Sequence, residues 1–514
     1  MADVPSLSRR HFLALASSSA ALAAISCTTL KAMAKATPIS MSELTRLSAS
    51  EAVAKISHGE VTAEKYATAL IERCEQCSAL NAFITFPKER VLEAARAADR
   101  FRTSGGKLGP LHGLPIPVKD SVNTKDMPTT GGTPALRSFQ PRENAPIVDA
   151  LLRAGAIILG KTNLHELSFG WTSNNLAFGA VHNPYDFKRI PGGSSGGTAA
   201  AVAAGMAPLG IAEDTEGSIR VPAAMCGIAG FRPTTGRYPS TGVVPITPLF
   251  DQVGPHARTV SDLALFDSVA TGDWTPLPAA ALKGTKLGIP RRYWFTDLDS
   301  EVERVTNEGL SKLQKAGAEL VEAEVPELER LVDLTTLPIQ NHDARYALRK
   351  YLEHYQAGIT LDELIAKASI DIRRDFHDLL PGGRFFVPED SYAVAVKVHL
   401  PKLKQTYRDY FARTGVTAIV FPTTMVPPPL IGDDVELTVG SKKVPFETAV
   451  ARNIAPGSTA GIPGLVLPAG TTPRGLPIAL EFDGPSGSDR SLLALGISLE
   501  RVLGKLPSPP LDLA

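Results

Sequence analysis

The feature that most constrains the fold is a glycine-rich loop with two adjacent serines at its centre, Gly192-Gly193-Ser194-Ser195-Gly196-Gly197. Glycine permits backbone conformations that other residues avoid, and both glycine and serine suit the start of a helix. An alanine-rich run continues from the loop to Ala204. The pattern therefore predicts a turn that leads directly into a helix.

Two catalytic or binding interpretations of this loop fail on context. A phosphate-binding P-loop requires a Gly-Lys-[Ser/Thr] ending, which the loop lacks. The pattern G-x-S-x-G of the α/β-hydrolase nucleophile elbow occurs at both Ser194 and Ser195, but the elbow follows an apolar strand. Residues 185–191 are mixed and charged, and they end in proline. A turn that only caps the next helix remains the simplest alternative.

Two further stretches carry reactive side chains. Lys119 follows the apolar run Pro115-Ile116-Pro117-Val118, and Ser218 lies within Asp214-Thr215-Glu216-Gly217-Ser218-Ile219-Arg220. Taken singly, Lys119 has the pattern of a solvated loop lysine and Ser218 that of a helix N-cap. Only the three stretches together indicate catalysis.

The combination resembles the amidase signature family. In that family a lysine in a V-K-D segment, the first serine of G-G-S-S-G-G and the serine before I-R form a catalytic triad. The resemblance implies that Lys119, Ser194 and Ser218 are the catalytic residues, and that a cis peptide bond holds Ser194. It extends from about residue 41 to 500 and includes Gly160-Lys161-Thr162-Asn163 and Gly461-Ile462-Pro463-Gly464.

The residue types suit the chemistry that this resemblance implies. An alkyl hydroxyl is a weak nucleophile near neutral pH and needs a base during attack. Burial lowers the pKa of a lysine, so a buried, neutral Lys119 can accept a proton. Ser194 would pass that proton from Ser218, because a hydroxyl both donates and accepts.

The resemblance also implies an oxyanion hole made of backbone N–H groups from Thr215, Glu216, Gly217 and Ser218. This chain departs from the family at two positions, since many members carry glycine at Glu216 and threonine at Glu213. A carboxylate near an oxyanion would oppose the developing negative charge. We therefore expect the Glu216 side chain to point away from the hole.

Four residues are expected to support the site. Asp214 and Arg220 would brace the nucleophile loop, although an ordinary surface ion pair is the alternative for them. Gly131 and Gly132 stand where relatives bring a loop near the triad.

The resemblance predicts amide hydrolysis. Residues 230–238 and 254–260 look most like indoleacetamide and mandelamide hydrolases, which implies an arylalkyl primary amide and release of ammonia. Two alternatives are the amidase subunit of a glutamine-dependent amidotransferase and a binding protein that has lost the chemistry. Esterase activity is expected as a side reaction.

Composition excludes several classes of partner and cofactor. The chain has 53 basic and 53 acidic residues, with no basic stripe for nucleic acid. The 10 histidines form no metal-ligand motif, and a Cys74-x-x-Cys77 pair has no second pair with which to bind a metal. We expect no cofactor, no metal and a small-molecule substrate, and we leave both a monomer and a homodimer open.

The N-terminus predicts export. Ser8-Arg9-Arg10-His11-Phe12-Leu13 is a twin-arginine motif, a mildly apolar stretch follows, and Ala32-Met33-Ala34 suits a signal peptidase. We expect residues 1–34 to be a signal peptide, the mature protein to be periplasmic, and no membrane span to remain after processing. A lipid anchor at Cys27 is the less favoured alternative.

The expected fold class is α/β, as one large domain over residues 41–505 with a central, mixed, twisted β-sheet covered by helices on both faces. Strand patterns occur at Ala154–Gly160, at residues 416–421 and at residues 465–468. Two helices are expected between about 41 and 80, with Thr62 capping the second. A helical excursion at about 275–440 is expected to cap the substrate pocket.

Overall fold

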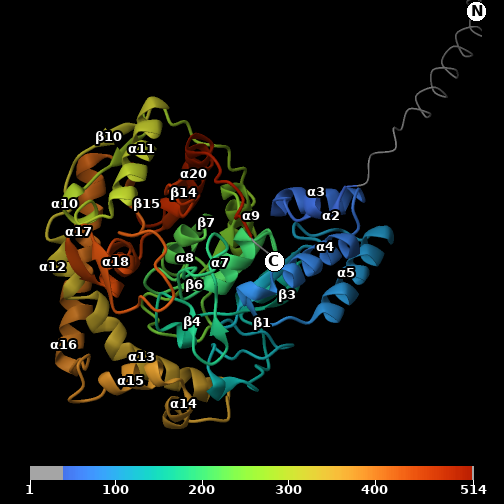
Figure 1. Cartoon of the computed structure of the whole chain (residues 1–514), viewed down its shortest axis with the longest axis horizontal. Helices are drawn as coiled ribbons and strands as arrows, with labels where there is room; N and C mark the ends of the chain where they lie inside the picture. The colour runs from blue at the N-terminus through green and yellow to red at the C-terminus, as the bar shows by residue number, and fades with distance from the viewer. Residues whose placement is uncertain (1–38, 512–514) are drawn as a thin grey trace, which may run out of the picture. The chain divides into compact units, whose positions relative to one another are not determined.

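The computed structural model describes residues 39–511 (Figure 1). The chain separates into two compact units, residues 1–43 and 44–514. The twin-arginine motif, the cleavage pattern and Cys27 lie outside the described residues. In the second unit, α3 (Ala49–His58) and α4 (Ala63–Gln76) are the two helices expected from the sequence, and the Thr62 hydroxyl caps α4 by accepting from the Lys65 N–H.

An 11-stranded sheet forms the core of this unit. Its strands are β1 (Phe83–Thr85), β2 (Pro115–Lys119), β3 (Ile157–Thr162), β6 (Leu209–Asp214), β7 (Ala229–Arg232), β8 (Gln252–Ala257), β9 (Lys286–Gly288), β10 (Glu319–Val321), β11 (Ala418–Pro422), β14 (Gly464–Thr471) and β15 (Pro477–Asp483). They are ordered β1-β3-β2-β6-β8-β7-β14-β15-β11-β9-β10. There are also two separate two-stranded sheets. One pairs β4 (Asn174–Asn175) with β5 (Gly179–Ala180), and the other pairs β12 (Glu436–Val439) with β13 (Lys442–Pro445).

The sheet is mixed, as expected. β2 runs parallel to both β3 and β6, whereas β6, β8, β7, β14, β15 and β11 alternate in direction. Parallel neighbours end at the same edge of a sheet, and Val118 of β2 pairs with Ile211 of β6. The ends of these strands, at Lys119 and Asp214, therefore lie at one edge, where two of the three stretches predicted to carry the site meet.

Helices cover both faces of the sheet. Successive strand residues point to opposite faces, and Leu480 and Glu481 are neighbours in β15. Leu480 packs against Gly309 of α11 (Ser300–Lys315), where an added Cβ would lie 2.9 Å from Leu480 Cδ1. Glu481 accepts a 2.7 Å hydrogen bond from Arg220 of α8 (Arg220–Met225), so α11 and α8 cover opposite faces. This arrangement confirms the predicted fold class.

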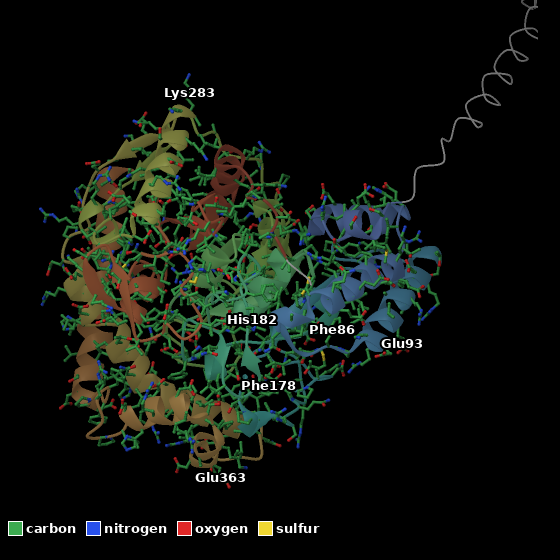
Figure 2. The ribbon with its side chains drawn as sticks, in the orientation of Figure 1. Phe86, Glu93, Phe178, His182, Lys283 and Glu363 are labelled. Carbon is green, nitrogen blue, oxygen red and sulfur yellow. The ribbon has the colours of Figure 1, made fainter. Side chains whose placement is uncertain are left out.

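Apart from the helical excursion described below, the other helices within residues 44–514 are α5 (Lys88–Thr103), α6 (Pro146–Arg153), α7 (Gly196–Ala203), α9 (Val260–Thr271), α10 (Arg291–Trp294), α18 (Phe446–Ala451), α19 (Ala455–Ala460) and α20 (Asp489–Leu503), with short η1 (Ser78–Leu80), η2 (Pro134–Leu136) and η3 (Glu166–Ser168). A short helix, α2 (Met41–Leu44), spans the boundary between the two units. Charged side chains such as Glu93, Lys283 and Glu363 point outward from this framework (Figure 2).

The helical excursion is narrower than the predicted range of about 275–440. β9, β10 and β11 lie within that range but belong to the central sheet, where β9 pairs with β10 and β11, and β11 pairs with β15. The strand pattern at residues 416–421 predicted β11. The helical part contains α12 (Leu328–Asp333), α13 (Thr336–His354), α14 (Leu361–Lys367), α15 (Ile370–Asp378), α16 (Glu389–Val394), η4 (Ala395–His399) and α17 (Leu400–Thr414). α13 to α16 lie together at the lower left of Figure 1.

This helical part is anchored over the site by an apolar cluster. Leu348 of α13 and Phe376 of α15 are fully buried in a cluster that also contains Leu167 and Val244 from the core domain. Leu167 directly precedes a residue of the pocket described below, Ser168. Within residues 39–511, every helix is too short or too polar to cross a membrane.

Candidate active site

Lys119 and Ser194 meet in a site closed to solvent. Lys119 is the last residue of β2 and has 0% exposure, and its Nζ donates to Ser194 Oγ at 2.6 Å. The Gly193–Ser194 peptide bond is cis, as the family resemblance implies. The Ser194 carbonyl accepts a 3.0 Å hydrogen bond from the His165 N–H, which fixes the loop beside the segment that follows β3.

The glycines of the loop are required by close packing. An added Cβ at Gly193 would lie 2.7 Å from the Trp171 carbonyl carbon, and one at Gly197 would lie 2.3 Å from the Asn163 carbonyl oxygen. Both contacts are shorter than real Cβ atoms tolerate, so larger residues would displace the loop. α7 begins at Gly196 and is buried through Val202, in agreement with the predicted turn-to-helix transition.

Ser218 lies at the opening of the site. It is 4% exposed and lines a pocket, and its carbonyl accepts from the Ser195 N–H at 3.3 Å, which ties the two serine loops together. Within residues 39–511 the Ser218 hydroxyl has no hydrogen-bond partner, so only the Lys119–Ser194 half of the expected relay is formed here. Two nearby histidines bond elsewhere: the half-buried His165 ring contacts the Thr172 hydroxyl, and the buried His256 ring contacts the Ile219 carbonyl.

The Lys119 amine also contacts the buried carboxylate of Glu213, the next-to-last residue of β6. The same oxygen, Oε1, accepts from Ser168 Oγ at 2.6 Å and from Ser121 Oγ at 3.5 Å. Burial lowers the pKa of Lys119, and the Glu213 carboxylate opposes this shift without cancelling it. The direction of the net shift is the one that a neutral amine needs.

The backbone of the nucleophile loop corrects one part of the predicted oxyanion hole. The Gly217 N–H donates to Asp214 Oδ1 at 2.7 Å, so it is not available to a substrate oxygen. Within the described part of the chain, the N–H groups of Thr215, Glu216 and Ser218 have no acceptor. These three remain the candidate donors. Position 217 instead requires glycine for the shape of the loop. Its φ is +102°, and an added Cβ would lie only 1.9 Å from Ile454 Cδ1.

Asp214 and Arg220 form a buried brace. Asp214 accepts from the Ile219 N–H at 3.0 Å and from Arg220 Nε at 3.0 Å, and their exposures of 0% and 1% exclude a surface ion pair. Arg232 adds a second contact at 3.3 Å. Burial alone would raise the pKa of Asp214, but the two arginines hold it at about 2.

Gly131 and Gly132 lie behind the site and do not line the pocket. The Gly131 N–H donates to the Asp120 carbonyl at 3.0 Å, and the Gly131 carbonyl accepts from the Leu167 N–H at 2.7 Å. The loop therefore joins the residue after Lys119 to the residue before Ser168. Positive φ angles of +59° and +67° explain why both positions are glycine.

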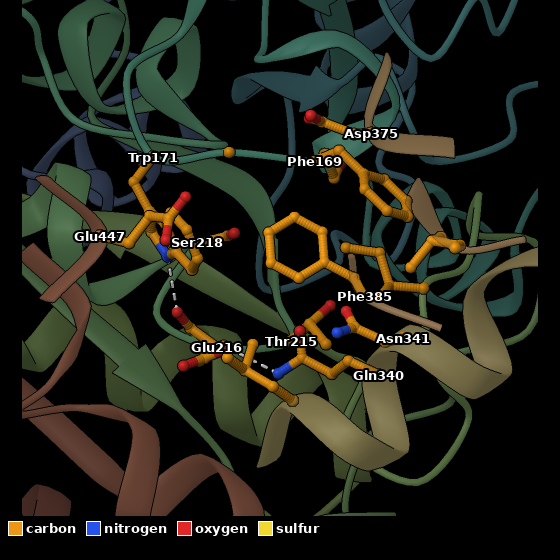
Figure 3. Close-up of a pocket in the computed structure, with 15 residues that line it drawn as sticks. Phe169, Trp171, Thr215, Glu216, Ser218, Gln340, Asn341, Asp375, Phe385 and Glu447 are labelled. Carbon is orange, nitrogen blue, oxygen red and sulfur yellow. Dashed lines mark hydrogen bonds between the residues drawn. The ribbon is translucent and has the colours of Figure 1, made fainter. Parts of the chain in front are cut away.

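The Ser218 hydroxyl faces a pocket of about 870 Å³, part of which is open to solvent (Figure 3). Three aromatic side chains, Phe169, Trp171 and Phe385, border it, and no described lining residue is basic. The complete lining is Ser168, Phe169, Gly170, Trp171, Thr215, Glu216, Ser218, Ile246, Leu337, Gln340, Asn341, Asp375, Leu379, Phe385 and Glu447.

Glu216 lies in the floor of this pocket and is turned toward α13. Its carboxylate accepts from Gln340 Nε2 at 2.6 Å, and its backbone carbonyl accepts from Trp171 Nε1 at 2.9 Å (Figure 3). Burial raises the pKa of Glu216 to about 7, against the effect of the Gln340 hydrogen bond. The side chain is therefore engaged by the helical excursion, although it remains part of the pocket wall.

Comparison with known proteins identifies the family. A family model described as amidase matches residues 66–493 of the chain. The chain belongs to the amidase family. Like other members, this amidase is a hydrolase of carbon–nitrogen bonds in linear amides.

Similar proteins cover almost the whole of this amidase. It is 38% identical to mandelamide hydrolase from Pseudomonas putida, over 91% of this chain and 93% of that protein. It is 38% identical to indoleacetamide hydrolase from Agrobacterium vitis, over 84% and 92% of the two chains. A crystal structure described as an amidase superposes with a TM-score of 0.80 at 30% identity, over 89% of this chain and 100% of the other.

Sequence reasoning missed most of the pocket of this amidase. Ser168, Phe169 and Trp171 closely follow the Gly160–Asn163 motif, but nothing in their pattern separates a pocket wall from a buried turn. Gln340 and Asn341 lie on one side of α13 and reach the pocket only through tertiary packing. The contact between Glu213 and Lys119 was also missed, although Glu213 stood out as a departure from the family.

Proposed function

We propose that this amidase hydrolyses an arylalkyl primary amide through an acyl-enzyme on Ser218, with Ser194 as relay and Lys119 as base. The observation that supports this proposal most strongly is the 2.6 Å contact between a fully buried amine and the Ser194 hydroxyl, next to a serine that faces a pocket. An amine in this position is desolvated and can serve as a base.

In the first half-reaction, Ser218 Oγ attacks the amide carbonyl carbon, and the carbonyl electron pair moves to oxygen. The Ser218 proton passes to Ser194, whose own proton passes to the Lys119 amine, so one ammonium and one oxyanion form together. The N–H groups of Thr215, Glu216 and Ser218 are the candidate donors to that oxyanion. Losing one such donor typically costs about 2.7–4 kcal/mol of transition-state stabilisation.

Collapse of the intermediate breaks the carbon–nitrogen bond. The Lys119 ammonium returns its proton through Ser194 to the leaving nitrogen, which departs as ammonia and leaves an ester on Ser218. Water then attacks the ester, and its proton follows the same route to Lys119. The second collapse returns that proton to Ser218 Oγ and releases the carboxylic acid, which ionises at neutral pH.

The substrate class is supported by the pocket and by the relatives. Phe169, Trp171 and Phe385 offer rings against which an aryl group can pack, and aromatic pairs gain about 0.5–1.5 kcal/mol beyond simple burial. The similar hydrolases are named for mandelamide and indoleacetamide, both of which are arylalkyl primary amides.

Ammonia release from a panel of amides tests this function. We expect phenylacetamide, mandelamide and indoleacetamide to be hydrolysed faster than propionamide. Ser218→Ala should remove turnover, and Lys119→Ala should lower it by about 10²- to 10⁴-fold, the usual contribution of a general base. Ser195→Ala is the matched control in the same loop, because its hydroxyl donates to the Glu213 carbonyl at 3.1 Å and has no part in the proposed proton path. Near-normal turnover by folded Lys119→Ala would contradict the proposal.

We also propose that the protein is exported by the twin-arginine route and works in the periplasm, with residues 1–34 removed. The motif at Arg9 and Arg10 supports this proposal. Replacing both by lysine should leave uncleaved precursor in the cytoplasm, as seen by fractionation and intact mass. Unchanged export of that variant would contradict it.

A further inference from the structure

A carboxylate that the proposed proton path does not use lies directly against the proposed base. Lys119 Nζ lies between two oxygens, Ser194 Oγ on the catalytic side and Glu213 Oε1 on the other. Both Lys119 and Glu213 are buried, with side-chain exposures of 0% and 3%.

We propose that Glu213 is a positioning residue: one carboxylate oxygen holds the Lys119 amine against Ser194 and retains the proton that the amine must lose before it can act as a base. This inference rests on the proposed function. A buried carboxylate in contact with an amine favours the ammonium form, since opposite charges attract strongly where water is excluded. The pair therefore releases its shared proton at a higher pH than a lone buried lysine would.

Ser168 modulates the interaction of Glu213 with the Lys119 ammonium. Its hydroxyl donates to the same Oε1 atom at 2.6 Å, and this hydrogen bond stabilises the carboxylate. Without it the negative charge of the carboxylate would be less satisfied and would attract the Lys119 ammonium more strongly. Removing the carboxylate and removing its hydroxyl donor should thus move the pH dependence in opposite directions, which a merely structural role for Glu213 would not do.

Beyond the buried Asp120–Lys161 pair beside β2, four other titratable groups lie close enough to influence the Lys119–Glu213 pair. These are Asp214 on β6, Asp251 next to β8, His256 on β8 and His165 after β3. Burial raises the pKa of Asp251 to about 7 and lowers those of His165 and His256 to about 4. All four residues are kept in the variants below, so their effects are common to the proteins that are compared.

The test is the pH dependence of Ser218 labelling by a fluorophosphonate. The reagent forms a phosphorus–oxygen bond with Ser218 Oγ and loses fluoride, while the hydroxyl proton leaves through the proposed path. The rate constant is measured from pH 5 to 10, and peptide mass spectrometry locates the adduct. This readout needs no knowledge of the natural amide.

We expect the acidic limb of this profile to move to lower pH by about one to three units in both Glu213→Gln and Glu213→Thr, the range that a contacting opposite charge produces. Glu213→Asp, which keeps the charge, should stay closer to wild type. Ser168→Ala should move the limb to higher pH. Glu500→Gln, a glutamate on α20 outside the pocket, is the matched control and should leave the limb unmoved.

A lower rate at all pH values with an unmoved limb in the Glu213 variants would overturn the inference, as would a shift to higher pH. If neither Glu213 variant folds, Ser168→Ala decides, and an unmoved limb there also overturns it. Absence of Ser218 labelling in the wild-type protein would instead refute the proposed function, and the inference with it.

Discussion

Asp214→Asn should weaken both the fold and the reaction, because this carboxylate organises the nucleophile loop. It accepts from the Gly217 N–H at 2.7 Å and the Ile219 N–H at 3.0 Å, on either side of Ser218, and it pairs with Arg220. Removing one partner from a buried ion pair typically costs about 3–5 kcal/mol. We expect the free energy of unfolding at pH 7 to fall by about that amount.

The pH dependence of this loss follows from the pKa of Asp214, which lies at about 2 in the folded protein against an ordinary value of 3.8. A lowered carboxyl pKa gives stability that is complete above about pH 5 and is lost as pH falls through the folded-state value, in total about 2–3 kcal/mol. The difference in unfolding free energy between wild type and Asp214→Asn should therefore shrink toward pH 2. Urea unfolding at several pH values measures it.

Asp267→Asn is the matched control for this experiment. Asp267 is fully buried and pairs with Arg237 at 2.7 Å and Arg490 at 3.2 Å, outside the pocket. It should lose comparable stability but keep the turnover number of the folded protein, whereas Asp214→Asn should lose turnover as well. If Asp214→Asn unfolds within 1 kcal/mol of wild type, or keeps wild-type turnover, the bracing role is wrong.

Three further predictions concern the pocket and the loop. Gly217→Ala should cost about 1–3 kcal/mol of stability through overpacking and reduce turnover, because its Cβ would meet Ile454. Adding Ile454→Val should recover only part of that stability, since the positive φ at position 217 stays unfavourable for alanine. Because the pKa of Glu216 is about 7, its carboxylate becomes charged above that pH, so KM for a carboxylate-bearing amide should rise relative to a neutral amide. Glu216→Gln should remove that dependence, and an unchanged KM ratio in steady-state assays would contradict it. Phe385→Ala should raise KM for phenylacetamide more than for propionamide, and an equal effect on both would exclude aryl packing there.

The sequence predicted the parts of the fold that depend on local pattern. Thr62 was identified as a cap because its hydroxyl acts within one helical turn, and the strands at residues 416–421 and 465–468 were identified by continuous apolar runs. β9 and β10 lie within the predicted excursion; the pattern at residues 286–290 predicts a strand, whereas no local pattern identifies β10. They are three-residue strands with exposed or half-exposed positions, and their place is determined by pairing with distant segments.

The site, too, was predicted where local motifs determine it and missed where contacts between distant segments determine it. The positions of Lys119, Ser194 and Ser218 were recognised from motifs, and the contact between the first two is present in the structure. The occupied Gly217 N–H was not foreseen, because it depends on which way the Asp214 side chain turns. The contact between Lys119 and Glu213 joins two neighbouring strands and depends on their register, which a single sequence does not reveal.

The central claim is that Ser218 carries the acyl group and that the buried Lys119 amine makes its attack possible. Acid quenching during turnover of an activated ester, 4-nitrophenyl phenylacetate, followed by peptide mass spectrometry, tests it most directly. The phenylacetyl mass should appear on Ser218 in the wild-type protein and be absent from folded Lys119→Ala under the same conditions. An acyl group on Ser194 or Ser195, or equal acylation of Ser218 without the lysine, would contradict the account.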